Sequence, residues 1–270
     1  PFDGERYGMK NIVITGSTRG IGYGLADAFL TLGCSVAISG RTQQKVDEAV
    51  ANLTSRHGSE KLFGLACDVT KVEQVRALWT ESKVRFRTVD IWINNAGINA
   101  GRIPFWQLSP DHIQAGVETN LIGAMHGAAV AISGMLEQGS GAVYNMEGLG
   151  SNGRRIRGLT LYGTTKRGLA YLTDALAGET KGTPIIAGAI RPGMVVTDLL
   201  TKPFDGNPAE WKRAKKVFNV LAERVETVTP WIAEKVLANT KTGIRIQWLT
   251  PSRVVFCSLR SLFTRRDLFR

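Results

Sequence analysis

Two side chains four positions apart, Tyr162 and Lys166 in the stretch "YGTTK", are of the types that could move a proton together. Positions i and i+4 of a helix share a face, so both side chains would point the same way. A free phenol has a pKa of about 10, too high for easy proton exchange at neutral pH, and a neighbouring ammonium lowers it. The pair predicts a proton donor to a carbonyl oxygen; the alternative is an ordinary amphipathic helix.

A glycine-rich segment near the N-terminus, "TGSTRGIG" (15–22), is typical of a phosphate-binding turn. It follows an apolar run and opens a helical pattern, which is the context such a motif requires. Gly16 would permit a tight turn, Gly20 would let the backbone approach a pyrophosphate, and Gly22 would let the helix pack closely. Free N–H groups at the helix start would then hold the anion, the alternative being a plain strand–helix turn.

The end of the next apolar run, "SGRT", bears on which nicotinamide cofactor fits. It carries no acid of the kind that binds a ribose 2′-hydroxyl. Arg41 stands there instead, and Arg19 lies in the glycine-rich segment. Two guanidiniums that converge on one phosphate would favour NADP(H) over NAD(H). The alternative is that these arginines are solvated surface.

The chain that must position these groups alternates between short apolar runs and helical patterns. Strands are expected at 11–15, 35–40, 61–69, 90–97, 141–146, 184–190 and 244–249. Helices are expected from the glycine cluster to Leu32 and at 42–56, 71–86, 111–137, 161–179 and 227–239. This alternation, with nearly continuous apolar strands, predicts an α/β fold: a Rossmann-type doubly wound parallel sheet with helices on both faces.

One domain is expected over 1–250, with a tail at 251–270. Residues 201–226 are polar and interrupt the sheet pattern, so we expect an irregular excursion with one or two helices that could act as a lid. The tail interleaves apolar residues with five arginines and is expected to be helical. Such a basic amphipathic helix suits an anionic membrane surface, the alternative being docking on the core or on a sister subunit.

Composition excludes several classes of protein. Hydrophobic residues make up 43% and charged residues 21%, ordinary values for a globular chain, and no apolar run reaches the length of a membrane span. Cys34 and Cys67 lie in apolar runs and are expected to be buried thiols of a reducing compartment. The three histidines form no ligand-like cluster, so no metal site is expected. The net charge of +11 has no recognition element beside it, so nucleic acid is not the expected partner.

Several segments in a fixed order together resemble the short-chain dehydrogenase/reductase superfamily over about residues 10–200. They are "TGSTRGIG" (15–22), "CDV" (67–69), "NNAG" (94–97), Asn120 in "ETNLIG", "YGTTK" (162–166) and "RPGMVVTD" (191–198). The resemblance implies an NADP(H)-dependent oxidoreductase that acts on a small carbonyl substrate. It also implies a homodimer or homotetramer.

The same resemblance implies roles for individual positions. Asn120 would anchor a water beside Lys166, and Lys166 with Tyr162 would border the cofactor ribose. The cofactor would also meet Gly16, Ser17, Thr18, Arg19, Gly20, Ile21, Gly22, Arg41, Asp68, Val69, Asn95, Ala96, Gly97, Pro192, Gly193, Val195 and Thr197. Within this set, Asp68 and Val69 are expected at the adenine. Pro192 to Thr197 would hold the carboxamide and the phosphates.

The serine that this superfamily usually carries about thirteen residues before the tyrosine is missing. Glu147, Gly148 and Leu149 occupy that neighbourhood, and the nearest hydroxyl is Ser151. Two replacements are open. Ser151 could turn back to polarise the substrate oxygen, or a backbone N–H of the "GLG" stretch could do so. The missing serine also keeps a third hypothesis open, a catalytically inactive NADP-binding sensor.

The unusual loop "NMEGLGSNGRRIRGLTLYGTTKRG", with "MVVTDLL" (194–200) and "FNVLAERVETV" (218–228), resembles the narrower group of chlorophyll(ide) b reductases. That resemblance implies NADPH-dependent reduction of the C7 formyl group of the pigment to hydroxymethyl. It implies a plastid location in a photosynthetic eukaryote and the cytoplasm in a bacterium. Arg154, Arg155 and Arg157 could meet carboxylates of such a substrate or form a solvated loop. A generic ketone or aldehyde reductase remains the alternative.

Overall fold

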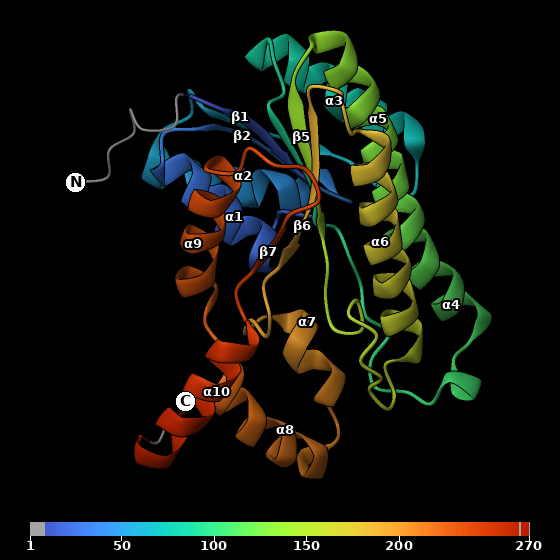
Figure 1. The fold of residues 1–270 in the computed structure, drawn as a ribbon, viewed down its shortest axis with the longest axis vertical. Helices are drawn as coiled ribbons and strands as arrows, with labels where there is room; N and C mark the ends of the chain where they lie inside the picture. The colour runs from blue at the N-terminus through green and yellow to red at the C-terminus, as the bar shows by residue number, and fades with distance from the viewer. Residues whose placement is uncertain (1–8, 265, 270) are drawn as a thin grey trace.

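Within the residues that the structure describes, 9–264 and 266–269, seven parallel strands form one sheet (Figure 1). The computed structural model places them in the order β3-β2-β1-β4-β5-β6-β7. Their bounds are β1 (Asn11–Ile14), β2 (Ser35–Gly40), β3 (Leu62–Ala66), β4 (Ile91–Asn94), β5 (Gly141–Met146), β6 (Ile185–Arg191) and β7 (Arg245–Gln247). The predicted doubly wound α/β fold is confirmed.

Helices cover both faces of this sheet, as Figure 1 shows. One layer contains α1 (Gly20–Thr31), α2 (Gln43–His57) and α9 (Val225–Leu237); the other contains α3 (Val72–Phe86), α5 (Gly123–Gln138) and α6 (Thr160–Glu179). Each layer closes its own apolar core against the sheet, one around Phe29 and Ile232 and the other around Trp92 and Met135. Both faces of the strands are therefore buried, which is why their sequences are apolar without alternation.

The predicted strands at 61–69 and 90–97 are too long. β3 ends at Ala66 and β4 ends at Asn94. The polar residues that follow leave the sheet at its carboxyl edge and make local bonds instead: Asp68 accepts from the N–H and hydroxyl of Thr70. The carboxyl ends of parallel strands meet at one edge, so these loops gather where a doubly wound sheet binds ligands.

The helix expected at 111–137 is one continuous rod with a widened turn. It consists of α4 (Pro110–Val117), a π-helical turn at Glu118–Ile122, and α5. Pro110–Gln138 is the one described helix long and apolar enough to cross a membrane by length and composition. However, α5 packs on β4, β5 and α3, so the apolar residues serve a core helix. A π-turn is frequently associated with a functional site, and this one carries the buried Asn120.

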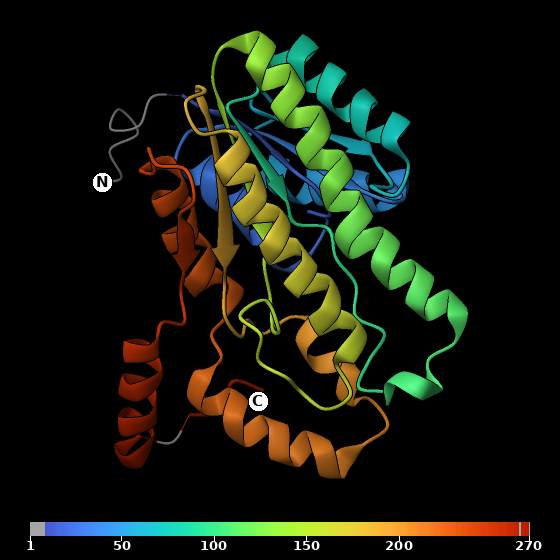
Figure 2. The ribbon, with the colours of Figure 1, turned by 45° about the vertical axis from the view of Figure 1, so that its right-hand side comes forward.

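Beyond the carboxyl edge of the sheet lies the helical excursion expected at 201–226, confirmed as α7 (Asp198–Thr201), a 3-10 turn (Lys202–Phe204) and α8 (Pro208–Leu221). Asn207 begins α8 by accepting the Glu210 N–H at 3.1 Å. An aromatic cluster holds these pieces together: Phe204, Trp211, Phe218 and Phe269. Figure 2 shows the excursion crossing below the sheet, with the C-terminal helix beside it.

The tail is helical only in its first part, α10 (Pro251–Phe263). After this helix the chain returns to α8, where the Phe269 ring lies 4.9 Å from that of Trp211. Arg266 pairs with Glu223 at 2.7 Å and fixes the return. Residues 266–269 therefore pack on this chain, whereas the apolar face of α10 that one of the two alternatives predicted to dock stays exposed. Arg265 and Arg270, part of the predicted basic tail, lie outside the described residues.

Candidate active site

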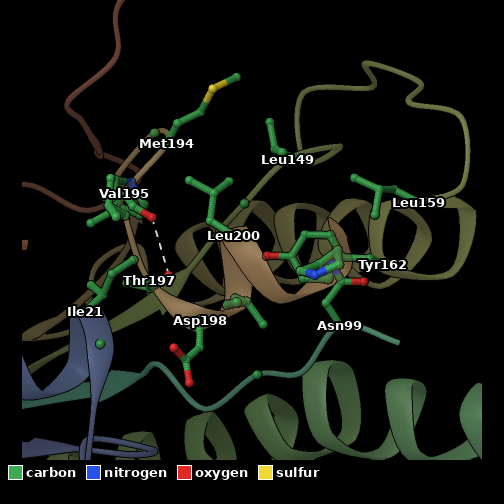
Figure 3. A pocket seen from close by; sticks show the side chains of 18 of the residues that line it. Ile21, Asn99, Leu149, Leu159, Tyr162, Met194, Val195, Thr197, Asp198 and Leu200 are labelled. Atoms are coloured by element: carbon green, nitrogen blue, oxygen red, sulfur yellow. Dashed lines mark hydrogen bonds between the residues drawn. The ribbon is translucent and has the colours of Figure 1, made fainter. Parts of the chain in front are cut away.

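A cavity of about 830 Å³ opens at the carboxyl edge of the sheet. The glycine turn before α1 forms one side, the end of β6 and α7 another, and α6 with the loop after β5 a third. Figure 3 shows Tyr162 pointing into it from α6, with Leu149 and Leu159 on one side and Leu200 across from it. Thirteen of the predicted site residues line it: Gly16, Arg19, Gly20, Ile21, Gly22, Asn95, Gly97, Tyr162, Lys166, Pro192, Gly193, Val195 and Thr197.

The glycine turn is packed so tightly that side chains would not fit. A Cβ on Gly16 would lie 2.7 Å from the Ala96 Cα, and one on Gly22 would lie 2.4 Å from the Asn95 amide nitrogen. Asn95 holds the turn by donating to the carbonyls of Thr15 and Gly16, each at 2.9 Å. No side chain caps α1, so its first N–H groups face the cavity unpaired. This arrangement fits a pyrophosphate.

Tyr162 and Lys166 reach the same cavity, but their electrostatics differ from the sequence-based prediction. Burial raises the pKa of Tyr162 to about 12. Burial lowers the pKa of Lys166 to about 8, and the negative charge of Glu147 opposes that change. The prediction of an unusually acidic phenol is therefore wrong. The Lys166 ammonium donates to the Met146 carbonyl at 2.8 Å and lies 5.7 Å from the centre of the Tyr162 ring, so desolvation of the phenolate prevails.

The Asn120 side chain is positioned by two hydrogen bonds with the backbone of Ile98. Its amide donates to the Ile98 carbonyl at 2.9 Å and accepts the Ile98 N–H at 2.7 Å. The same amide donates to the Thr165 hydroxyl at 3.1 Å, which ties the π-turn to α6. A Cβ on Gly97 would lie 3.4 Å from the Asn120 carbonyl oxygen and 3.6 Å from the Lys166 nitrogen, so both groups face one point. The water that Asn120 would anchor there stays a prediction.

Ser151 does not reach the reacting end of the cavity. Its side chain is 2% exposed and is not among the cavity-lining residues. Gly150 has φ +96° and packs on Gly163, while Arg167 donates to the Ser151 carbonyl at 3.0 Å. These contacts hold Ser151 against α6, so the prediction that its hydroxyl polarises the substrate is wrong.

Gly148 lies so close to the Tyr162 hydroxyl that a side chain would not fit there. A Cβ built there would lie 2.5 Å from the Tyr162 hydroxyl oxygen. Gly148 and Leu149 both line the cavity, and neither of their N–H groups donates to another described residue. The alternative donor, a backbone N–H of the 148–150 stretch, is therefore compatible with the geometry and stays a prediction.

Gly148→Ala tests this close approach. The added methyl group would displace the Tyr162 hydroxyl, and misplacement by about 1 Å can cost about 10²-fold in rate. We expect kcat for carbonyl reduction to fall by about that factor, with little change in cofactor affinity, measured by steady-state kinetics and cofactor titration. Gly163→Ala is the matched control, because its Cβ would have only one neighbour, at 3.9 Å. Equal activities of the two variants would contradict the prediction.

A buried carboxylate that the sequence did not single out lines the same cavity as Tyr162 and Lys166. Glu147, whose side chain is fully buried, lines the cavity directly after β5. It accepts from Arg191 at the end of β6 and, at 3.3 Å, from Arg245 on β7. Arg245 also donates to Asp174 of α6 at 2.6 Å. This chain of charges joins three strand ends to the helix that carries Tyr162.

The two arginines predicted to converge on a phosphate have different surroundings. Arg19 lines the cavity and pairs with Asp198 at 2.9 Å, whereas Arg41 is exposed directly after β2. Their convergence on a cofactor phosphate stays a prediction. Other predicted residues also lie outside the cavity lining: Ser17, Thr18, Asp68, Val69, Ala96 and Asn120. The Ser17 hydroxyl instead donates to the Ile14 carbonyl and accepts the Ser39 N–H, which joins the glycine turn to β1 and β2.

The outer part of the cavity is apolar with a charged rim. Its apolar wall includes Ile156, Leu159, Met194, Leu200, Phe204, Val217 and Phe218. Arg102, Arg154 and Arg213 line the rim, where the Arg102 guanidinium lies over the Phe204 ring. Arg155 and Arg157 do not line the cavity, so the predicted loop contributes one arginine and not three. Most of this wall forms only when α7, the 3-10 turn and α8 pack beside the cavity, so no short sequence motif predicts it.

The sequence matches the short chain dehydrogenase family over residues 10–207. It is 39% identical over 238 residues to chlorophyll(ide) b reductase NOL, chloroplastic, of Arabidopsis thaliana, covering 86% of this chain and 67% of the relative. Identity to the same-named protein of Oryza sativa subsp. japonica is 33% over 274 residues, covering 95% and 78%. A solved structure of ElxO, with a tyrosine-to-phenylalanine substitution and NADPH bound, is 25% identical with a TM-score of 0.77, covering 88% and 96%.

Proposed function

Because this chain belongs to the short-chain dehydrogenase family, whose members are oxidoreductases acting on carbonyl or hydroxyl groups, we propose that it reduces a formyl group with NADPH. The proposed substrate is chlorophyll(ide) b, whose C7 formyl group would become hydroxymethyl. The named relatives support this choice of pigment. Their chloroplastic description supports a plastid location if this chain comes from a photosynthetic eukaryote.

The observation that carries the proposal is the shared cavity of the glycine turn and Tyr162. Gly16 and Gly20 border it on one side, and the Tyr162 hydroxyl points into it from another. A cofactor seated on the turn and a carbonyl bonded to Tyr162 would therefore meet within one cavity. The apolar outer wall suits a large apolar substrate with the formyl group innermost.

Each side chain has a separate task in this reaction. NADPH, when bound, supplies the hydride to the carbonyl carbon. Tyr162, kept protonated by its raised pKa, gives the proton to the carbonyl oxygen. Lys166 places an ammonium at the same end of the cavity, where it stabilises the phenolate left behind and would hold the cofactor ribose. The apolar wall excludes water from the exchange.

Loss of NADPH absorbance tests the proposal, with chlorophyllide b and simple aromatic and aliphatic aldehydes as substrates. We expect turnover of the pigment with formation of its hydroxymethyl product, identified by chromatography. Turnover of simple aldehydes without the pigment would overturn the pigment assignment and leave a generic reductase. Tight NADPH binding with no turnover of any aldehyde would overturn reduction altogether and favour a sensor.

Arg41 is the residue proposed to select NADP(H). Its exposed guanidinium follows β2, and no described residue pairs with it. Loss of a charge-assisted hydrogen bond between this guanidinium and a cofactor 2′-phosphate would weaken NADPH binding roughly tenfold. We expect Arg41→Ala to raise KM for NADPH by about 10-fold and to leave KM for NADH unchanged. Arg85→Ala, which removes an exposed arginine from α3, is the control; parallel changes for both cofactors would contradict the role.

A further inference from the structure

The C-terminal helix α10 presents an uncovered apolar stripe. Its members recur every three or four positions along the helix: Val255, Phe256, Leu259, Leu262 and Phe263. Leu262 is 75% exposed and Phe263 is 85% exposed, so neither the sheet nor α8 covers them. Packing on this chain half-buries Val254 and Cys257 of α10 and residues 266, 268 and 269 after it, but leaves the five side chains of the stripe exposed. The stripe therefore faces outward from a structured element.

α10 is anchored at its start, so its orientation is set by the fold. Thr250 caps the helix by accepting the Arg253 N–H at 3.2 Å. The Arg253 guanidinium lies 3.5 Å from the centre of the Trp248 ring, and Trp248 packs on Trp231 of α9. The helix also packs on α8. Figure 2 shows α8 and α10 together at the end of the molecule beyond the sheet.

Positive charge surrounds this end of the molecule. Lys212, Arg213 and Lys216 are exposed on α8, and Arg260 is exposed on α10 itself. Two acids at this end are paired: Glu210 lies 3.8 Å from Arg102, and Asp267 lies 3.1 Å from Lys215. The apolar stripe is thus set in a cationic surface.

The charge decides between two occupants of the stripe. A second copy in a symmetric dimer would place the same patch against itself, so exposed cations of α8 and α10 would face like charges. An anionic lipid surface would accept the aromatic and leucine side chains and would neutralise the surrounding cations. We propose that α10 lies in the plane of an anionic lipid surface, with the stripe immersed and the α8 cations at the headgroups.

This docking would also orient the cavity. Val217 and Phe218 of α8 line the cavity wall, and Arg213 lines its rim. A lipid surface held against α8 and α10 would therefore lie close to the route by which a lipophilic substrate arrives. This last consequence rests on the proposed function, whereas the binding of lipid does not.

Vesicle flotation of the full chain tests the proposal. We expect binding to vesicles of phosphatidylcholine with phosphatidylglycerol to exceed binding to pure phosphatidylcholine on the order of 10- to 100-fold, and to weaken with salt. The triple variant Phe256→Ser, Leu262→Ser, Phe263→Ser should lose binding without a change in melting temperature. Val84→Ser, which removes an apolar side chain 72% exposed on α3, is the control and should bind as the parent does.

Three results would overturn the proposal. These are no flotation with either vesicle, equal flotation with both, or retained flotation of the triple variant. Light scattering that shows a dimer in the parent and a monomer in the triple variant would assign the stripe to a second copy instead. The soluble-aldehyde assay separates this inference from the proposed function, because the triple variant should keep the parent rate there.

Discussion

Replacing Tyr162 with Phe is expected to lower kcat for carbonyl reduction by about 10²- to 10⁴-fold, the range for loss of a general acid. The hydroxyl faces the cavity, and its pKa of about 12 keeps the proton in place until the carbonyl oxygen gains charge. Phe fills the same volume, so the apolar wall and the glycine turn are unchanged. NADPH affinity, measured by fluorescence titration, should stay within about twofold of the parent value.

Tyr144→Phe is the matched control for this substitution. Tyr144 is fully buried in β5, and its hydroxyl accepts from Asn239 at 2.8 Å, away from the cavity lining. Its loss should reduce the free energy of unfolding by about 1 kcal/mol and leave kcat unchanged. Full activity of the Tyr162 variant, or equal loss of activity in both variants, would contradict the assignment of Tyr162 as proton donor.

Glu147→Gln is expected to destabilise the protein by about 2–3 kcal/mol. Removing one partner of a buried ion pair costs about 3–5 kcal/mol, and the partial exposure of the two arginines reduces that figure. The arginine side chains are 22% and 26% exposed, while the carboxylate is fully buried. Urea unfolding should therefore show a lower midpoint with an unchanged slope.

Glu81→Gln provides the comparison for an exposed pair. Glu81 bonds Arg85 four residues later on α3, and the side chains of Glu81 and Arg85 are 37% and 54% exposed. Its removal should change the free energy of unfolding by about 0.5 kcal/mol or less. A Glu147 variant as stable as the Glu81 variant would show that the charge chain from β5 to α6 does not hold the strand ends.

Glu147 also has an expected effect on the pH dependence of the reaction. The pKa of Lys166 is lowered to about 8, so its ammonium is present below that pH and lost above it. We expect kcat/KM for reduction, which reports the free enzyme, to fall as pH rises through about 8. The negative charge of Glu147 opposes the lowering of the Lys166 pKa, so Glu147→Gln should move the fall in kcat/KM to lower pH. An unchanged pH dependence of kcat/KM in this variant would assign Glu147 a structural role alone.

The order of elements and the cofactor turn could be predicted from local sequence. Continuous apolar strands such as Ile91–Asn94 can be buried only between two helical layers. The glycines at 16, 20 and 22 have few other uses at the start of a helix. The position of Tyr162 and Lys166 on one helix face could also be predicted, because their spacing on one helix does not depend on distant contacts. These predictions rest on short-range geometry, which residues close together in the sequence set once the local helix or turn forms.

The burial of the catalytic pair could not be predicted in this way. Its effect on the pKa of Tyr162 depends on α6, β5 and the loop after β5 closing around one point, and desolvation outweighs the neighbouring ammonium. The role predicted for the Ser151 hydroxyl was wrong for a related reason. Contacts of Gly150 with Gly163 and of the Ser151 carbonyl with Arg167 direct the loop toward α6. Both depend on residues that are close only in the folded chain.

Short-range patterns were sufficient to predict the parallel sheet, the glycine turn and the face of α6 that carries Tyr162 and Lys166. The contacts at that site exist only in the folded chain: Glu147 with two arginines from neighbouring strands, Gly148 beside the phenol, and Arg19 with Asp198. Hydrophobic period and residue propensity act over a few residues. Desolvation, ion pairing and close packing instead depend on distances that the whole fold sets.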